Sequence, residues 1–465
     1  MTHTMKLTRR ALTAGLAAPF GLAAQTRTAP APPESPARHL ARKVFQEVAA
    51  SLYAWDLLDE GCEPIMETLK ETTQANSLYL VALMHHEKRP LTDFYYPHNP
   101  KRKTYFPEDS RVYWQPHADC YRDSKIKPLT SERDELKKTD WLEMLVKAAR
   151  KAGWKTGAEI SHTVLDKQRA AEQHVSAVQR DIRGTPLGQL ICPNNPDAAA
   201  YLLALFTDLV KNYDVDFVMT CLRPFESGGR GGPRGRTPGA TEIVLGAVLG
   251  SCFCESCVAA AKSDGMDLRA MQRAMLPLAD ALTDRGNLAG AHAISLLHAS
   301  NTSVTALLVQ HPEIFDHIRF RCASLTRMFA RVRQAITAIR PNVDLRLNAF
   351  IYDNWELSGI DFAALRPHLG SIRSSNYDEQ SGSMDRMEHK RQFLLAVRAA
   401  AGDEIPFLSA IGIRPRATPE LIRRGVRISS ECGADGLSLG HYDGASLENL
   451  EAIGQGLREA GIRVG

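Results

Sequence analysis

The chain has little net charge and, beyond its first 24 residues, no long hydrophobic run. Its 465 residues include 57 Lys or Arg and 53 Asp or Glu, which gives a formal net charge of +4 at pH 7. A membrane-spanning helix needs about 18 or more consecutive apolar residues, and no later stretch approaches that length. Basic side chains also form no sustained face. We therefore expect no membrane association after removal of an N-terminal signal, and no nucleic-acid partner.

Several motifs that would point to specific chemistry are also missing. The Gly- and Arg-rich stretch 227–236 has neither GxGxxG nor GxxxxGK spacing, so no phosphate-binding loop is expected there. No HxH or HExxH spacing marks a histidine metal site. Nine cysteines in so long a chain are not the dense disulfide framework of a small secreted domain.

Residues 1–24 have the pattern of an export signal. Three basic residues precede an apolar run of small residues over 11–24, and a Pro-rich linker follows at 25–45. Arg9 and Arg10 lie in a pattern that resembles the twin-arginine signal, whose bacterial pathway carries folded proteins. A general secretory signal that happens to contain two arginines is the alternative. Both interpretations predict a periplasmic or secreted protein.

The remaining chain, residues 46–465, alternates short apolar segments with amphipathic ones. The segment 187–226 shows this best: Asn195 and Pro196 suit the cap and first turn of a helix, apolar residues recur at helical spacing, and a buried strand follows at 216–219. Eight strands are expected, at 51–55, 77–84, 155–160, 216–219, 343–351, 371–375, 405–411 and 436–439. Long insertions are expected at about 88–131 and 223–310.

This alternation predicts an α/β fold with a parallel sheet, and eight strand-helix units are the number that closes a (β/α)8 TIM barrel. We expect one barrel domain with long insertions after strands 2 and 4. An open, doubly wound sheet is the alternative.

Three segments carry a resemblance to a known group. They are CPNNPDAAAYLLALFTDLVKNYDVDFV at the third helix and fourth strand, CFCESC in the second insertion, and GADGLSLGHYDG at the eighth strand. With these segments the chain resembles the poorly characterised glycosyl-hydrolase-like TIM barrels, over about 51–465. The resemblance implies a carbohydrate or glycoside substrate. Relatives of this kind commonly present a carboxylate on the fourth strand, where this chain has Thr220 and Cys221.

Hydrolysis of a glycosidic bond usually needs two carboxyl groups, one to protonate the leaving oxygen and one to act as nucleophile or base. Active sites of TIM barrels form at the carboxyl ends of the strands. We predict Glu226, after the fourth strand, as acid/base, opposite Asp378 after the sixth strand as nucleophile or base, with Glu379 beside it. A salt bridge to a loop Arg or Lys is the alternative for any one of these carboxylates.

Other polar and aromatic residues fall at the expected strand ends, where aromatic rings can stack on sugar rings. Packing among the upper loops is the alternative for each aromatic residue. The predicted substrate-binding residues are Trp55, Asp56, His85, His86, Glu159, His162, Arg223, Asn348, Tyr352, Tyr377, His441, Tyr442 and Asp443.

Cys252, Cys254 and Cys257 form a compact CxCxxC cluster. Their thiolates, with Cys192 or Cys221 as a fourth, suit a tetrahedral structural zinc. A disulfide and simple buried packing are the alternatives. We expect no cofactor to be required for activity.

The leading hypothesis is an exported glycoside hydrolase or related carbohydrate-active enzyme. A carbohydrate-binding barrel without catalysis is one alternative, because the seventh strand ends in Ser409, Ala410 and Gly412 rather than a carboxylate. A metal-dependent sugar lyase or isomerase, which would use the histidines, is the other.

Overall fold

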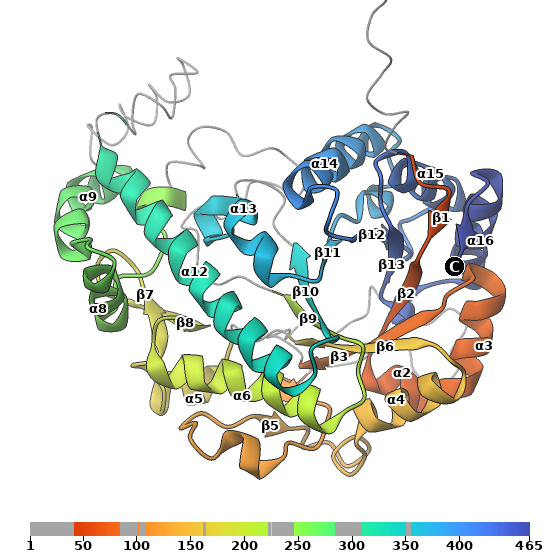
Figure 1. Cartoon of the computed structure of the whole chain (residues 1–465), viewed down its shortest axis with the longest axis horizontal. Helices are drawn as coiled ribbons and strands as arrows, with labels where there is room; N and C mark the ends of the chain where they lie inside the picture. Colours follow the sequence, from red (N-terminus) through yellow and green to blue (C-terminus); the bar gives the residue numbers. More distant parts are fainter. Residues whose placement is uncertain are drawn as a thin grey trace, which may run out of the picture.

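Eight parallel strands close into a barrel in the computed structural model, which describes residues 41–83, 101, 108–160, 164–221, 225, 246–283, 309, 311–349 and 355–465 (Figure 1). Strand β2 pairs with both β3 and β13, and this pairing completes the ring. In ring order the strands are β2 (Glu47–Leu52), β3 (Ser77–Leu83), β6 (Lys155–Ile160), β9 (Phe217–Cys221), β10 (Asp344–Ala349), β11 (Ser371–Ser374), β12 (Phe407–Gly412) and β13 (Gly436–Gly440). The predicted TIM barrel is confirmed, and the open sheet is excluded.

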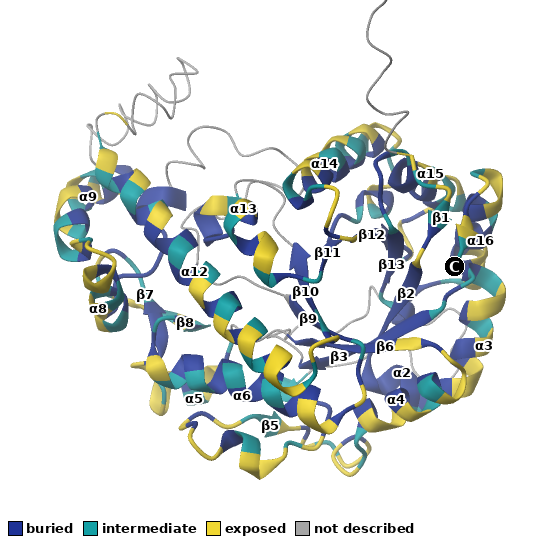
Figure 2. Ribbon diagram, in the orientation of Figure 1, coloured by how far each residue is buried: buried dark blue, intermediate teal, exposed yellow. Residues whose placement is uncertain are grey.

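Helices cover the outside of the ring, and their buried faces meet the strands (Figure 2). They are α2 (Ala54–Asp59), α3 (Cys62–Thr73), α4 (Trp141–Lys151), α6 (Pro196–Asn212), α12 (Pro312–Ile339), α13 (Phe362–Leu365), α14 (Asp385–Ala401), α15 (Pro419–Glu431) and α16 (Leu447–Glu459). Among the described residues, no helix has both the length and the apolar character of a membrane span.

The helix starts follow the capping residues in the sequence. The Asn195 side chain accepts hydrogen bonds from the backbone N–H groups of Asp197 and Ala198, at 3.0 and 3.1 Å, and Pro196 occupies the first turn of α6. Thr418 caps α15 in the same way, ahead of Pro419. These caps fix where the loops after β8 and β12 end.

The first strand lies earlier than expected, at Glu47–Leu52 rather than 51–55. The aromatic residues that suggested a strand belong to the next element, because Tyr53 caps α2 and Trp55 lies within that helix. The strand itself alternates Glu47, Ala49 and Ser51 toward the barrel interior with apolar residues outward. Small inward residues weaken the apolar signal by which a strand is recognised.

Additional short elements lie outside the ring. They are β1 (Val44–Phe45) paired with β14 (Arg463–Val464), β4 (Arg111–Val112) and β5 (Leu129–Thr130) beside β3, a hairpin of β7 (Val178–Arg180) and β8 (Pro186–Ile191), and the helices α5 (Lys167–Glu172), α8 (Glu255–Ser263) and α9 (Leu268–Thr283). This hairpin was not predicted from the sequence. Figure 1 shows α8, α9 and β7 together beside α12.

An ion pair occupies the amino-terminal end of the barrel interior. Two guanidinium nitrogens of Arg346 donate to the two carboxylate oxygens of Glu47 at 2.9 and 3.0 Å, and the Arg346 guanidinium lies 3.8 Å from the centroid of the Phe217 ring. Both charged side chains are almost fully buried. Above them an apolar layer of Ala49, Tyr79, Phe217, Met219 and Leu408 fills the barrel. The amino-terminal half of the barrel is therefore packed, and room for a site exists only toward the other end.

Breaking this ion pair is expected to destabilise the protein. Burial favours the neutral form of Glu47, but the charge and hydrogen bonds of Arg346 outweigh it and hold the pKa of Glu47 below its ordinary value. Arg346→Met leaves a buried carboxylate without its partner and should lower the free energy of unfolding by about 3–5 kcal/mol at pH 7. Because the folded pKa of Glu47 is lowered, the difference from wild type should shrink as the pH falls below about 4.

Urea denaturation of wild type and variant at several pH values measures this difference. The control is Arg122→Met, which removes an exposed partner of Asp119 and should change stability by less than about 0.5 kcal/mol. Equal costs for Arg346→Met and Arg122→Met would contradict the ion pair's contribution.

Candidate functional site

Arg373 lies at the centre of a polar cluster at the carboxyl end of the barrel. Its side chain is fully buried on β11 and donates hydrogen bonds to Ser438 Oγ at 2.7 Å, Asn348 Oδ1 at 2.9 Å and Ser375 Oγ at 2.6 Å. A further hydrogen bond reaches the hydroxyl of Tyr377. One guanidinium thus orients side chains from β10, β11 and β13, where a TIM barrel has its active site.

Glu159, at the end of β6, joins this cluster through Asn348. The Asn348 amide donates to Glu159 Oε1 at 3.2 Å while its own oxygen accepts from Arg373. Burial raises the pKa of Glu159, against the attraction of Arg373 and the hydrogen bond from Asn348. A buried carboxyl whose pKa is raised holds its proton closer to neutral pH, as a general acid must.

Asp443 supplies a second buried carboxyl, from the turn after β13. Arg414, two residues after β12, donates to Asp443 Oδ1 at 3.3 Å. Asp443 Oδ2 is buried and has no hydrogen-bond partner in the described part of the chain. Burial raises the pKa of Asp443, and Arg414 opposes that effect by favouring the ionised form.

Tyr53 links the two carboxyls electrostatically. Burial is the main cause that raises the pKa of the Tyr53 phenol, and the charges of Asp443, Glu159 and Asp56 raise it further while Arg414 lowers it. Glu159 and Asp443 therefore lie within electrostatic range of the same phenol. They come from strands that are separated in the ring by β2 and β3, and both lie at the carboxyl end of the barrel, which we call the mouth.

His441 follows β13 directly in a strained backbone conformation. Its φ is +51°, which non-glycine residues seldom adopt, and such strain is concentrated at functional sites. The ring of His441 stacks on Tyr53 with centroids 5.0 Å apart, and its Nδ1 lies 3.0 Å from Ser51 Oγ. Next to it, Gly440 lets the backbone approach Tyr377, because a Cβ there would lie 2.3 Å from the Tyr377 ring.

The predicted catalytic residues Asp378 and Glu379 lie beside α14, in ion pairs. Asp378 accepts hydrogen bonds from Arg386 at 2.7 Å and from His389 at 2.7 Å. Burial opposes ionisation of Asp378, but hydrogen bonds from His389, Asn376 and Arg386 hold its pKa below the ordinary value.

Glu379 lies 2.8 Å from Lys390, and neither side chain is exposed to solvent. Its other oxygen accepts from the backbone N–H of Gly412 at 3.1 Å. Through these contacts Asp378 and Glu379 attach α14 to the barrel. Their catalytic assignment stays a prediction without support from their surroundings.

Three predicted substrate-binding residues make internal contacts. Trp55 belongs to the hydrophobic core and stacks on Tyr53, with ring centroids 4.2 Å apart. The carboxylate of Asp56 accepts from the backbone N–H of Tyr53 at 2.7 Å, which caps α2. The hydroxyl of the buried Tyr442 donates to Glu60 at 2.8 Å. These three residues therefore contribute to the structure around the site, and their contacts are with other protein groups.

Of the other predicted site residues, Glu159, Asn348, Tyr377, His441 and Asp443 come together at the mouth. Glu226, His85, His86, His162, Arg223 and Tyr352 lie outside the described residues. Tyr53, Arg373 and Arg414 were not predicted from the sequence. One signal in the sequence could have identified Arg373. The short strand 371–375 carries an arginine between serines, so its inward-facing positions are polar.

Thr220 faces away from the barrel interior. Phe217 and Met219 belong to the apolar layer inside the ring, whereas Val218 belongs to the outer core, so alternation places Thr220 on the outer side. A carboxylate at position 220 would therefore point away from the barrel interior.

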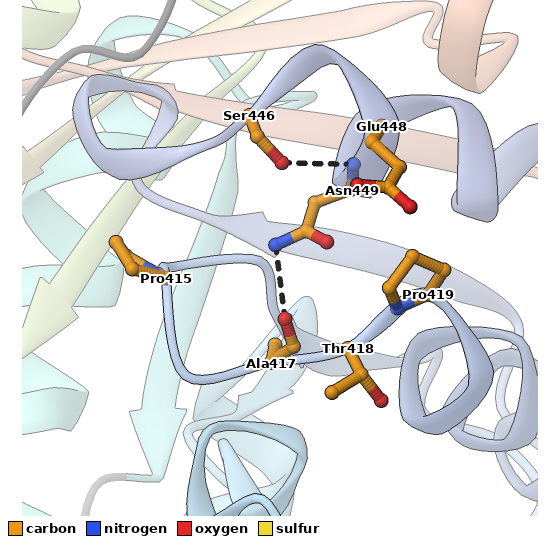
Figure 3. A pocket seen from close by; sticks show the side chains of 7 residues that line it. All are labelled: Pro415, Ala417, Thr418, Pro419, Ser446, Glu448 and Asn449. Carbon is orange, nitrogen blue, oxygen red and sulfur yellow. Dashed lines mark hydrogen bonds between the residues drawn. The ribbon is translucent and has the colours of Figure 1, made fainter.

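A small cavity of about 280 Å³ lies nearby, between the loops after β12 and β13 (Figure 3). Asn449 spans these loops, because its amide donates to Ile413 O at 3.0 Å and Ala417 O at 3.2 Å. Thr418 and Ser446, which also line the cavity, cap α15 and α16. Its polar groups serve the loop structure, and the cavity contains neither Glu159 nor Asp443.

One group with metal-ligand geometry occurs among the described residues: Cys192, Cys252, Cys254 and Cys257. Cys192 is thus the fourth cysteine of the predicted cluster. The eight described cysteines outside the barrel strands have free thiols, so the disulfide alternative finds no support there.

The raised pKa of Glu159 predicts a specific pH dependence of stability. Because its folded pKa lies above the ordinary value, Glu159 stabilises the fold at acid pH, and this contribution is lost as the pH rises through the folded pKa. Relative to Glu159→Gln, which does not titrate, wild type should lose stability as the pH rises from about 4 toward neutral. Urea denaturation of both proteins across this range measures the difference. A difference that is constant or grows with pH would contradict the buried, proton-holding carboxyl.

Comparisons with known proteins find a likeness in fold to solved structures. No protein family matches the sequence, and no relative was found among characterised proteins. The solved structures that resemble it include α-L-fucosidase isoenzyme 2 from Paenibacillus thiaminolyticus (TM-score 0.52, 15% identity, 90% of this chain and 49% of that chain) and the PgaB (BpsB) glycoside hydrolase domain from Bordetella bronchiseptica (TM-score 0.54, 12% identity, 90% and 99%).

A β-galactosidase from the psychrophilic Marinomonas ef1 is similar as well (TM-score 0.50, 11% identity, 89% of this chain and 59% of that chain). The chain spans about half the length of the fucosidase. At these identities the likeness concerns the fold. The chain is a TIM barrel of the kind found in glycoside hydrolases.

Proposed function

We propose that the chain is an exported carbohydrate-active enzyme that hydrolyses glycosidic bonds at the mouth of its barrel. The observation that carries this proposal is a pair of buried carboxyls at the carboxyl end of the barrel: Glu159, held by Asn348, and Asp443, held by Arg414. Burial raises the pKa of both carboxyls. Glycoside hydrolysis usually needs two such groups. The glycoside hydrolases among the structural neighbours support a carbohydrate as the substrate class.

The surroundings of the two carboxyls suggest different tasks. Glu159 accepts a hydrogen bond from a neutral amide, and burial raises its pKa, so we assign it as the general acid that protonates the leaving oxygen. Asp443 contacts the guanidinium of Arg414, which favours its ionised form, and retains one oxygen without a hydrogen-bond partner among the described residues. We assign it as the nucleophile or base.

The remaining polar groups suit recognition of sugar hydroxyls. Tyr377 and His441 are partly exposed, and each is fixed from the barrel side by Arg373 or Ser51. Rigid partners of this kind reduce the ordering cost of ligand binding. Asn348 and Arg373 hold Glu159 in place and are positioning residues in this account.

Activity on a panel of aryl glycosides and oligosaccharides tests the proposal. Glu159→Gln and Asp443→Asn should each lower kcat/KM by about 10²–10⁴-fold, because each removes proton transfer or the attacking carboxylate. The matched control is Glu448→Gln, an exposed carboxylate at the rim of the small cavity near this face, which should leave kcat/KM unchanged.

Two further variants separate this assignment from the one made by sequence. Asp378→Asn should lower stability through loss of the Arg386 and His389 contacts but keep kcat in the folded protein. Activity retained in Glu159→Gln and Asp443→Asn but lost in Glu226→Gln or Asp378→Asn would overturn the residue assignment. Absence of any hydrolysis by wild type, with thermal stabilisation by a sugar, would favour the non-catalytic binding barrel.

Export by the twin-arginine route is the second part of the proposal, and it rests on Arg9, Arg10 and the apolar run after them. The double substitution Arg9→Lys, Arg10→Lys should keep the precursor in the cytoplasm, as measured by cell fractionation. Arg27→Lys, beyond the apolar run, is the control. Unchanged export of the double variant would indicate a general secretory signal instead.

A further inference from the structure

Four cysteine side chains meet outside the barrel, three from the second insertion and one from the connection before α6. Cys192 follows β8 and precedes α6, while Cys252, Cys254 and Cys257 lie at the start of α8. All four side chains are buried, and their sulfur atoms lie within 4.8 Å of one another. The sulfur of Cys192 is 3.4 Å from that of Cys257 and 3.5 Å from that of Cys254.

These separations match the ligand set of a single tetrahedral ion. A Zn–S distance of about 2.3 Å places the four sulfurs of such a site about 3.8 Å apart. A cluster of several iron and sulfide atoms would hold its outermost cysteine sulfurs farther apart. The geometry therefore fits one metal ion with four thiolate ligands.

A buried cation next to the cysteines provides independent support. Arg321, on α12, has no exposed surface, and its guanidinium donates to Leu357 O at 2.9 Å, Ala247 O at 3.1 Å and His317 Nδ1 at 3.1 Å. All three acceptors are neutral, and no carboxylate contacts Arg321 within the described ranges. An isolated buried charge is costly, so a counter-charge is required.

Four thiolates around a divalent ion supply that counter-charge. Such a centre carries a formal charge of −2, and Arg321 lies within electrostatic range of two of its ligands, Cys252 and Cys257, as well as of Cys322 on its own helix. Gly250 allows this approach, because a Cβ at that position would lie 2.4 Å from the Arg321 guanidinium. Among the residues that the structure describes, neutral thiols would leave the guanidinium without an opposite charge in contact.

Hydrogen-bond donors also point at the sulfurs. Asn194 donates to Cys257 Sγ at 3.3 Å and to Ser324 Oγ at 3.0 Å, which connects the cluster to α12. The backbone N–H of Arg180, on β7, donates to Cys252 Sγ at 3.4 Å. Donors in these positions orient thiolate ligands and stabilise their charge.

We infer that Cys192, Cys252, Cys254 and Cys257 bind one zinc ion that fastens the second insertion to the barrel. The ion would join the β8–α6 connection, α8 and, through Asn194 and Arg321, helix α12, which Figure 1 shows in one region beside the ring. Four protein ligands leave no open position for water or substrate, so the centre is structural. It does not depend on the proposed glycosidase activity.

Metal analysis of the wild-type chain, purified without a His-tag after expression with added zinc, tests the inference. About one zinc per chain is expected, released on titration of the thiols with a mercurial reagent. Less than about a tenth of an equivalent of zinc, a disulfide between any two of these cysteines, or stoichiometric iron in its place would overturn it.

Variants locate the ion. Cys192→Ser and Cys257→Ser should each lose zinc, whereas Cys432→Ser, a buried cysteine at the end of α15, should keep one equivalent. If a variant fails to fold, wild type treated with a strong chelator gives the same information. Protease cleavage within 246–283 should then become faster, while cleavage elsewhere is unchanged. Cleavage of 246–283 at the same rate with and without the ion would contradict the fastening of the insertion.

Discussion

The guanidinium of Arg373 determines the arrangement of the barrel mouth. It is a cation with almost no exposed surface, and its hydrogen bonds to Asn348, Ser375, Tyr377 and Ser438 satisfy its donors from three strands. Asn348, held by Arg373, in turn orients Glu159 by donating a hydrogen bond to its carboxyl group. A buried charge of this kind must be solvated by fixed protein groups. The groups that solvate it are thereby held in place before any ligand arrives, as a catalytic site requires.

The fold could be predicted from the sequence because its signals are local. Asn195 with Pro196, and Thr418 with Pro419, mark helix starts by capping chemistry that needs no tertiary partner. Apolar residues predominate on the outer faces of the eight strands, and this pattern recurs along the chain. The first strand was misplaced since its inward residues, Glu47, Ala49 and Ser51, carry no apolar signal, and their partner Arg346 is 299 residues away along the chain.

The site was only partly predictable, because its partners are distant in sequence. Position at a strand end identified Glu159 and Asp443, but also Asp378 and Glu379. The two pairs differ in their contacts with helix α14. Arg386, His389 and Lys390 of this helix form ion pairs with Asp378 and Glu379. The CxCxxC spacing identified three thiols, whereas Cys192 joins them only through the unexpected β7–β8 hairpin.

The position of a bound sugar tests the central claim most directly. Crystals soaked with iminosugars that imitate the charged transition state of glycoside hydrolysis would show where the ring binds. The account predicts density at the mouth, with ligand atoms within about 3 Å of Glu159 or Asp443 and of Tyr377 or His441. A sugar bound instead against Asp378, or in the small cavity beside Asn449, with an empty mouth, would contradict it.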